Sequence, residues 1–212
     1  MSFIWLLACS QELPPTTVEG DEFVSIRVEP DQFTVVTGPG GVDPIAFAAF
    51  GTDPDLQETE LGTVEWTVSN RSAGTIDEQG LFTPTLTNGG VTWVVARLGG
   101  VEGFSTLTVL YEDAVNPEGI DVTPFESGVV PIESEFWLYP QDGVSLPRNT
   151  PAIRFNWSNP GAASAFRLRF VSSVTDISVY TTSTSWTADE DTWLNLASTN
   201  AGSRAVVPTR AM

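Results

Sequence analysis

Residues 64–84 read Val-Glu-Trp-Thr-Val-Ser-Asn-Arg-Ser-Ala-Gly-Thr-Ile-Asp-Glu-Gln-Gly-Leu-Phe-Thr-Pro, and this stretch decides the fold. Its first residues alternate, so that Val64, Trp66 and Val68 share one face of an extended segment, which predicts a half-buried strand. A turn-forming segment follows, and Gly80 can adopt the positive φ of a tight turn. We therefore expect short strands joined by turns, with Trp66 at the centre of a core between two sheets.

The same period-two spacing recurs along the chain and predicts an all-β protein. Strands are expected at residues 23–30, 32–37, 44–51, 64–68, 81–82, 91–98 and 104–111, and again at 135–140, 152–157, 166–170, 177–180 and 204–207. Within segment 91–98, Val91, Trp93 and Val95 share one face. Acidic residues 189–191 precede a short apolar segment, which predicts one or two helical turns. The pattern favours two tandem immunoglobulin-like β-sandwich domains.

The organising stretch also carries a motif that extends to a Gly-Gly pair and a Val-rich strand. The motif consists of Trp66, Val68, Gly74, Ile76, Asp77, Gly80, Leu81, Phe82, Thr83, Pro84, Gly89 and Gly90. It resembles the bacterial immunoglobulin-like repeat (Big, group 2) over roughly residues 24–111. The resemblance implies a β-sandwich that serves as a spacer or display unit on surface proteins.

A second motif covers residues 136–207. It consists of Tyr139, Pro140, Asp142, Gly143, Leu146, Pro147, Phe155, Trp157, Phe166, Arg167, Leu168, Trp193, Asn200 and Gly202. It resembles a fibronectin-III-like module of the large predicted lipoproteins of deltaproteobacteria such as myxobacteria. The chain stops just past the last expected strand, which is compatible with a truncated module.

The N-terminal segment ends in Leu6-Leu7-Ala8-Cys9, which resembles the lipobox of bacterial lipoprotein signal peptides. The resemblance implies cleavage before Cys9 and a lipid on that residue, and Ser10 favours the outer membrane. The alternative is a buried or frayed segment with an incidental cysteine. The expected organisation is a signal peptide with its lipobox (1–9), a polar tether (10–22), a first domain (23–112), a linker (113–119) and a second domain (120–212).

Charge and composition restrict the function. The chain has 27 acidic residues against 9 basic ones, all arginine, and a net charge of −18. This balance argues against nucleic acid and against an anionic membrane face. There is no histidine, the commonest general base and zinc ligand, and Cys9 is the only cysteine. We therefore expect no enzyme and no cofactor.

Two weak sites are kept as alternatives. Asp53 and Asp55 form the best calcium candidate, although a solvated acidic loop is the favoured interpretation. Trp186, in a Ser/Thr-rich turn, and Trp137 are candidate sugar-binding residues. We expect a non-enzymatic surface or periplasmic lipoprotein with a structural, spacer or adhesive role, held at the membrane by its lipid and contacting a surface glycan or protein. A carbohydrate-binding module is the alternative.

Overall fold

The computed structural model describes residues 23–126, 130–131, 137–141, 144, 149–159, 162–200 and 209–211 of the 212. The expected signal peptide, Cys9 and the tether lie outside these residues. The described part is mostly β-strand, with a single α-helix among its elements. The prediction of an all-β protein is therefore confirmed.

One layer of the N-terminal half is made of two small antiparallel sheets. The first has the order β1-β4-β5 and the second the order β3-β8-β7, with β3 leading directly into β4. The strands are β1 (Ser25–Glu29), β3 (Ile45–Ala46), β4 (Ala48–Thr52), β5 (Glu58–Glu60), β7 (Gly74–Ile76) and β8 (Leu81–Pro84). Strand β5 is not among the strands expected from the sequence, because all three of its residues are exposed and show no apolar alternation.

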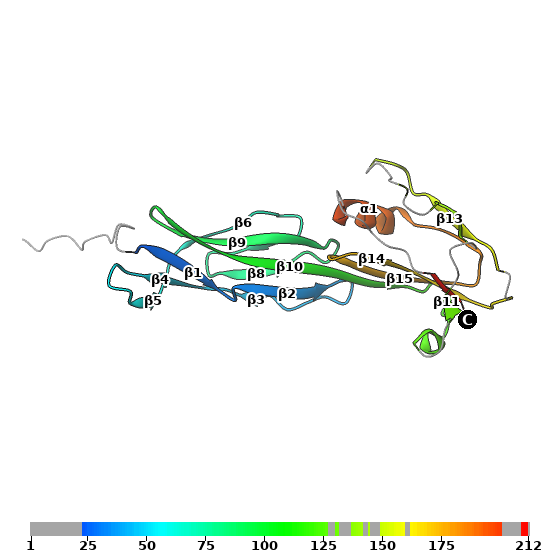
Figure 1. Ribbon diagram of the computed structural model, residues 1–212, viewed down its shortest axis with the longest axis horizontal. Coiled ribbons are helices and arrows are strands. Elements are labelled where there is room, and N and C mark those ends of the chain that lie inside the picture. Colours follow the sequence, from blue (N-terminus) through cyan, green and yellow to red (C-terminus); the bar gives the residue numbers. More distant parts are fainter. Residues whose placement is uncertain are drawn as a thin grey trace, which may run out of the picture.

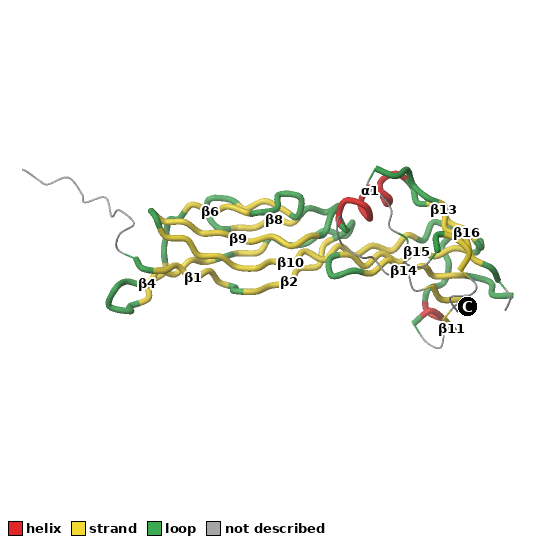
Figure 2. Tube along the Cα trace, turned by 45° about the horizontal axis from the view of Figure 1, so that its top comes forward, coloured by secondary structure: helices red, strands yellow, loops and turns green. Residues whose placement is uncertain are grey.

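The other layer is a sheet with the order β2-β10-β9-β6. Its strands are β2 (Gln32–Thr37), β6 (Glu65–Val68), β9 (Gly90–Leu98) and β10 (Val101–Val115). Strand β2 runs parallel to β10, whereas β9 is antiparallel to both β10 and β6. Figures 1 and 2 show these strands running along the length of the N-terminal half.

The core of this half lies between the two layers and is largely aliphatic. Its buried members are Ile26, Val28, Val35, Phe47, Ala49, Val64, Ala73, Phe82, Val94, Ala96, Leu107 and Val109. Trp66 is only partly buried and packs against this cluster. The prediction that Trp66 forms the centre of the core is therefore wrong; fully buried Phe82 lies among the aliphatic side chains instead.

The turn at residues 77–81 explains the Asp-x-x-Gly-Leu spacing of the organising stretch. The Asp77 carboxylate accepts hydrogen bonds from the backbone N–H groups of Gln79, at 3.0 Å, and Leu81, at 2.9 Å. Gly80 has the predicted positive φ, +79°. A side chain there would also meet the Phe47 carbonyl at 2.6 Å and the Trp66 ring at 3.0 Å, so only glycine fits.

The C-terminal half contains a three-stranded sheet and the continuation of the large sheet. The first has the order β12-β13-β16, and the second continues as β11-β17-β14-β15-β10. The strands are β11 (Val130–Pro131), β12 (Trp137–Tyr139), β13 (Arg154–Trp157), β14 (Phe166–Val171), β15 (Thr175–Thr181), β16 (Ser185–Thr187) and β17 (Thr209–Ala211). Its core is rich in aromatic residues, including Phe155, Trp157, Phe166, Phe170 and Trp193.

Helix α1 (Glu190–Thr199) follows β16, and a short 3₁₀ helix, η2 (Thr123–Phe125), follows β10. The Asp189 carboxylate caps α1 by accepting the Thr192 N–H at 2.9 Å. The helix is longer than the predicted one or two turns because Trp193 and Leu196, three residues apart, bury one side against the aromatic core. No helix in the described part of the chain is long and apolar enough to span a bilayer.

Strand β10 belongs to both halves of the molecule. It pairs with β9 from Val101 to Val109, and then with β15, in parallel, from Tyr111 to Val115. The predicted linker, residues 113–119, thus begins inside this strand. As a result the large sheet continues from one half into the other, and the described protein is elongated (Figure 1).

Candidate functional site

The two tryptophans predicted as sugar ligands lie against the aromatic core. The Trp137 ring stacks on Trp157, with centroids 6.0 Å apart and planes at 7°, and its indole N–H donates to the Pro140 carbonyl. The Trp186 ring lies 5.8 Å from that of Phe155. Both indoles are half-buried, so their rings are largely used for packing. A sugar-binding role for them remains a prediction.

The predicted calcium ligands lie in the turn between β4 and β5. Asp53 Oδ1 accepts the backbone N–H groups of Asp55, at 2.9 Å, and Gln57, at 2.8 Å. This carboxylate therefore stabilises the turn in which it lies. Over the described ranges, no group of three or more His, Cys, Asp or Glu side chains is placed to hold a metal ion. The calcium site remains a prediction.

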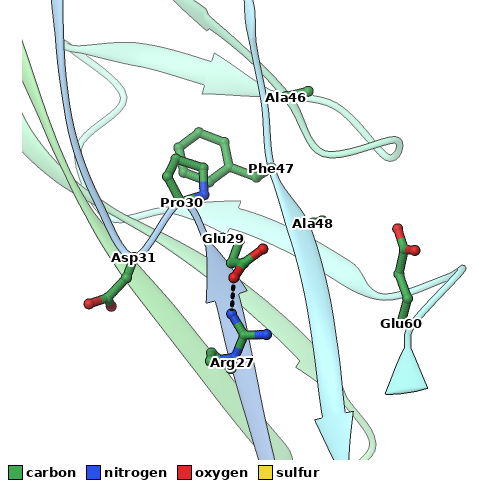
Figure 3. A pocket seen from close by; sticks show the side chains of 8 residues that line it. All are labelled: Arg27, Glu29, Pro30, Asp31, Ala46, Phe47, Ala48 and Glu60. Carbon is green, nitrogen blue, oxygen red and sulfur yellow. Dashed lines mark hydrogen bonds and ion pairs between the residues drawn. The ribbon is translucent and has the colours of Figure 1, made fainter. Parts of the chain in front are cut away.

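A recess of about 750 Å³ opens beside β1 and β4 (Figure 3). Arg27 lies in it and bonds to Glu29 and, at 2.9 Å, to Glu58. The hydrogen bond from Arg27 lowers the pKa of Glu58, so both groups stay charged and paired near neutral pH. Figure 3 shows Phe47 and Pro30 on the apolar side of the recess and Glu60 apart on its own strand. The guanidinium of Arg27 is therefore held between two carboxylates at the edge of this recess.

A cleft of about 490 Å³ lies where the two halves meet. Tyr111 and Asp113 of β10 line one side, and Asp191, Asn195 and Ser198 of α1 line the other. Burial, together with the neighbouring Asp113 carboxylate, raises the pKa of Tyr111 to about 12. The phenol is thus neutral, and its O–H donates to Asp113 Oδ2 at 3.3 Å.

The polar groups of α1 near this cleft bind the N-terminal half. Asn195 donates its amide N–H to the Thr87 carbonyl, and Ser198 donates to Asn88 Oδ1 at 3.1 Å. The backbone N–H of Gly89 donates to Thr199 Oγ1 at 3.3 Å. We conclude that these groups join the two halves and that the cleft is a seam between them.

The outer surface of the large sheet presents exposed aromatic residues. We call this surface the aromatic face: Val91 and Trp93 of β9, and Phe104, Thr106 and Thr108 of β10. Trp93 is 57% exposed and Phe104 is 66% exposed. Their ring centroids lie 6.3 Å apart, with the planes tilted by 42°. Among the tryptophans that the structure describes, Trp93 is the only exposed one.

Hydrogen bonds on the β6 side hold Trp93 outward. Ser69 Oγ accepts the backbone N–H of Trp93 at 2.8 Å. Buried Thr92 turns the other way, and its hydroxyl accepts the Asn70 N–H at 3.0 Å. Val94 is fully buried on the same side as Thr92. Because alternate side chains point to opposite faces, these contacts leave Trp93 in solvent.

Charged residues border the aromatic face at one end. Arg97 forms ion pairs with Glu102 and, at 4.0 Å, with Glu65. The hydrogen bond that Arg97 donates to the Glu102 carboxylate raises the pKa of Arg97, which therefore stays charged. The five side chains of the aromatic face carry no charge. One clue to this surface is visible in the sequence: Trp93 lies in a strand whose two faces are both apolar.

A comparison with models of known protein families finds no match, and neither does a comparison with curated proteins. The likeness of residues 24–111 to a bacterial immunoglobulin-like repeat therefore depends on the motif residues alone.

Proposed function

We propose that this protein is a non-enzymatic lipoprotein that acts as a stiff spacer at the bacterial surface or in the periplasm. The observation that carries the proposal is the sharing of β10 between the two halves. A strand that pairs with β9 along one part and with β15 along the next leaves no flexible linker at that point. A stiff, elongated body suits a protein that holds other groups away from a surface.

The strand pairings support the immunoglobulin-like part of the proposal. In the N-terminal half, β1-β4 and β3-β8-β7 form one layer, and β2-β10-β9-β6 the other. Two layers of mainly antiparallel strands packed over one core are typical of immunoglobulin-like sandwiches, although β2 runs parallel to β10 here. The three-stranded sheet β12-β13-β16, across an aromatic core from β14 and β15, supports a second such domain.

Side-chain contacts after β10 add to the stiffness. Glu118 accepts hydrogen bonds from the hydroxyls of Thr181, at 2.9 Å, and Thr182, at 2.7 Å. These bonds, that of Thr182 first, lower the pKa of Glu118, so the carboxylate stays charged and able to accept. Asn116 also exchanges two hydrogen bonds with the backbone of Ile120. The segment after β10 is thus fixed to the end of β15.

Distances between spin labels would test the stiffness. In a Cys9→Ser background, Thr59→Cys and Ser183→Cys place one label on each half at exposed positions. A matched pair within one half, Thr59→Cys with Glu78→Cys, measures the spread that the labels themselves cause. We expect the distances between the halves to be as narrowly distributed as those of the matched pair. A broad or two-peaked distribution would contradict the spacer function.

Lipid attachment at Cys9 is a separate part of the proposal and has its own test. Mass spectrometry of the protein from bacterial membranes should find a diacylglyceryl group on Cys9, and Cys9→Ser should move the protein to the soluble fraction. An unmodified Cys9 in membrane-associated protein would remove the anchor from the proposal while leaving the spacer intact.

A further inference from the structure

We propose that the aromatic face binds an uncharged glycan, with Trp93 as its principal contact. This site goes beyond the spacer function and lies on the opposite half from Trp137 and Trp186. More than half of each ring-bearing residue is exposed to solvent, at 57% for Trp93 and 66% for Phe104. They are also diagonal neighbours on the paired strands β9 and β10. Trp93 lies opposite Thr106, and Phe104 lies opposite Val95.

The chemistry of the aromatic face suits a sugar ring. One side of a hexose is lined with C–H groups, which pack on the electron-rich face of an indole or phenyl ring. Its edge carries hydroxyls, which need hydrogen-bond partners nearby. Thr106 and Thr108 lie beside the rings on β10, and Thr34 pairs with Thr108 across β2. Apolar rings and hydroxyls thus alternate over a single sheet surface.

The tilt between the rings favours a chain over a single sugar. Trp93 and Phe104 are 6.3 Å apart but inclined by 42°, so one flat ring cannot lie on both. Successive residues of a twisted glycan can each meet one ring. We therefore expect oligosaccharides to bind more tightly than the corresponding monosaccharide.

Charge selects an uncharged ligand. Residues 20–113 hold 15 acidic residues and 3 arginines, a net charge of −12, which repels anionic glycans and a second copy of this chain. A cationic partner would need carboxylates within the contact, and the aromatic face has none. Glu65 and Glu102, at the end of the face, are paired with Arg97. The net negative charge of this half and the lack of charged side chains on the aromatic face both favour an uncharged, polyhydroxylated ligand.

Native affinity electrophoresis in gels that contain neutral polysaccharides (a β-glucan, a mannan and a galactan) would test the site. We expect one of them to retard the wild-type protein. Trp93→Ala should weaken that binding at least about tenfold, and Phe104→Ala should weaken it to a smaller extent. Both side chains are exposed, so both variants should keep the wild-type melting temperature.

The matched control is Tyr139→Ala, which removes a 47% exposed aromatic residue from β12 on the other half. It should bind as the wild type does. Absence of retardation by all three polysaccharides would overturn the proposal, as would a Trp93→Ala variant that binds normally. Loss of binding in a folded Trp186→Ala variant, with Trp93→Ala unaffected, would move the site to the other half.

Analytical sedimentation of the wild type over a range of concentrations tests whether a second copy of this chain, and not a glycan, covers the aromatic face. A monomer at all concentrations is expected. A dimer that Trp93→Ala abolishes would assign the aromatic face to self-association and would overturn the glycan proposal. Neither result bears on the spacer function, which the spin-label distances test independently.

Discussion

The two halves of the molecule use tryptophan in opposite ways. In the C-terminal half, Trp157 is 2% exposed and lies in a cluster of aromatic rings, including Trp137 and Phe166. In the N-terminal half the core is aliphatic, and Trp93 is 57% exposed on the outside of the same large sheet. The comparison shows that the residue type does not decide whether a side chain is buried; the face of the sheet onto which the strand register places that side chain decides it.

The inward residues of β9 explain the difference. Thr92, Val94 and Ala96 are all buried, and two of them have small side chains. These inward residues pack within the core of the N-terminal half, so the indole of Trp93, next to them in sequence, lies on the other face of β9. In the C-terminal half, β13 directs Phe155 and Trp157 inward, and the neighbouring strands and α1 surround these larger rings.

Truncation of the two indoles should give very different losses. We expect Trp157→Ala to lower the free energy of unfolding by about 3–5 kcal/mol, because it leaves a cavity in a packed core. Trp93→Ala should change it by less than about 0.5 kcal/mol, since the side chain is exposed. Urea denaturation followed by circular dichroism measures both. Equal losses would mean that Trp93 is also a core residue.

A second test concerns the seam between the halves. A Cβ on Gly89 would lie 1.9 Å from the Val174 carbonyl oxygen, which already accepts the Tyr111 N–H at 3.0 Å. Gly89→Ala should therefore cost about 1–3 kcal/mol and broaden the spin-label distances between the halves. Gly40→Ala is the control, since a Cβ there meets nothing within 4 Å. If both variants behaved like the wild type, the seam would not be tightly packed.

A third, smaller effect concerns the start of α1. Asp189 accepts the Thr192 N–H at 2.9 Å and the Thr192 hydroxyl at 2.7 Å. Asp189→Ala should lower the free energy of unfolding by about 1 kcal/mol because the first turn loses its cap. Asp189→Asn keeps an acceptor oxygen and should lose much less. Thermal denaturation of both variants would show whether α1 depends on this cap, and equal losses would indicate a dependence on charge alone.

The smallest expected effect is on the pH dependence of stability. The hydrogen bonds from Thr192, that of its backbone N–H first, lower the pKa of Asp189. A carboxylate whose pKa is lower in the folded than in the unfolded state stabilises the fold above the unfolded value and loses this effect as the pH falls through the folded value. The advantage of the wild type over Asp189→Asn should therefore be constant above about pH 5 and shrink below about pH 4. Urea denaturation at pH 7 and pH 3 measures it, and an advantage that persists unchanged at pH 3 would contradict the lowered pKa.

Local patterns predicted the positions of many strands along the chain. The alternation at residues 32–37 corresponds to β2, and the acidic residues before Thr192 marked the start of α1. Strand β5 was not predicted, because three exposed residues paired to one edge of β4 show no periodicity. The continuation of β10 to Val115 was also not predicted, since its pairing with β15 joins residues more than sixty positions apart.

The candidate site shows the limit of sequence reasoning most clearly. Hydrophobicity alone would turn Val91 and Trp93 of β9 inward and leave Thr92 outside, whereas the observed register does the reverse. The hydroxyl of Thr92 can be buried because the Asn70 N–H donates to it at 3.0 Å. That partner follows β6, 22 residues earlier in the chain, and cannot be assigned from spacing along β9.

The sequence by itself determined the all-β class, the turns and the strongly acidic surface, because these depend on alternation, on glycine and aspartate at fixed spacings, and on charge counts. The tertiary structure decided which apolar side chains are buried, how β10 joins the two halves and where aromatic rings meet solvent. Those properties depend on which strands pair and in which register. Both are settled by contacts between residues far apart in the chain.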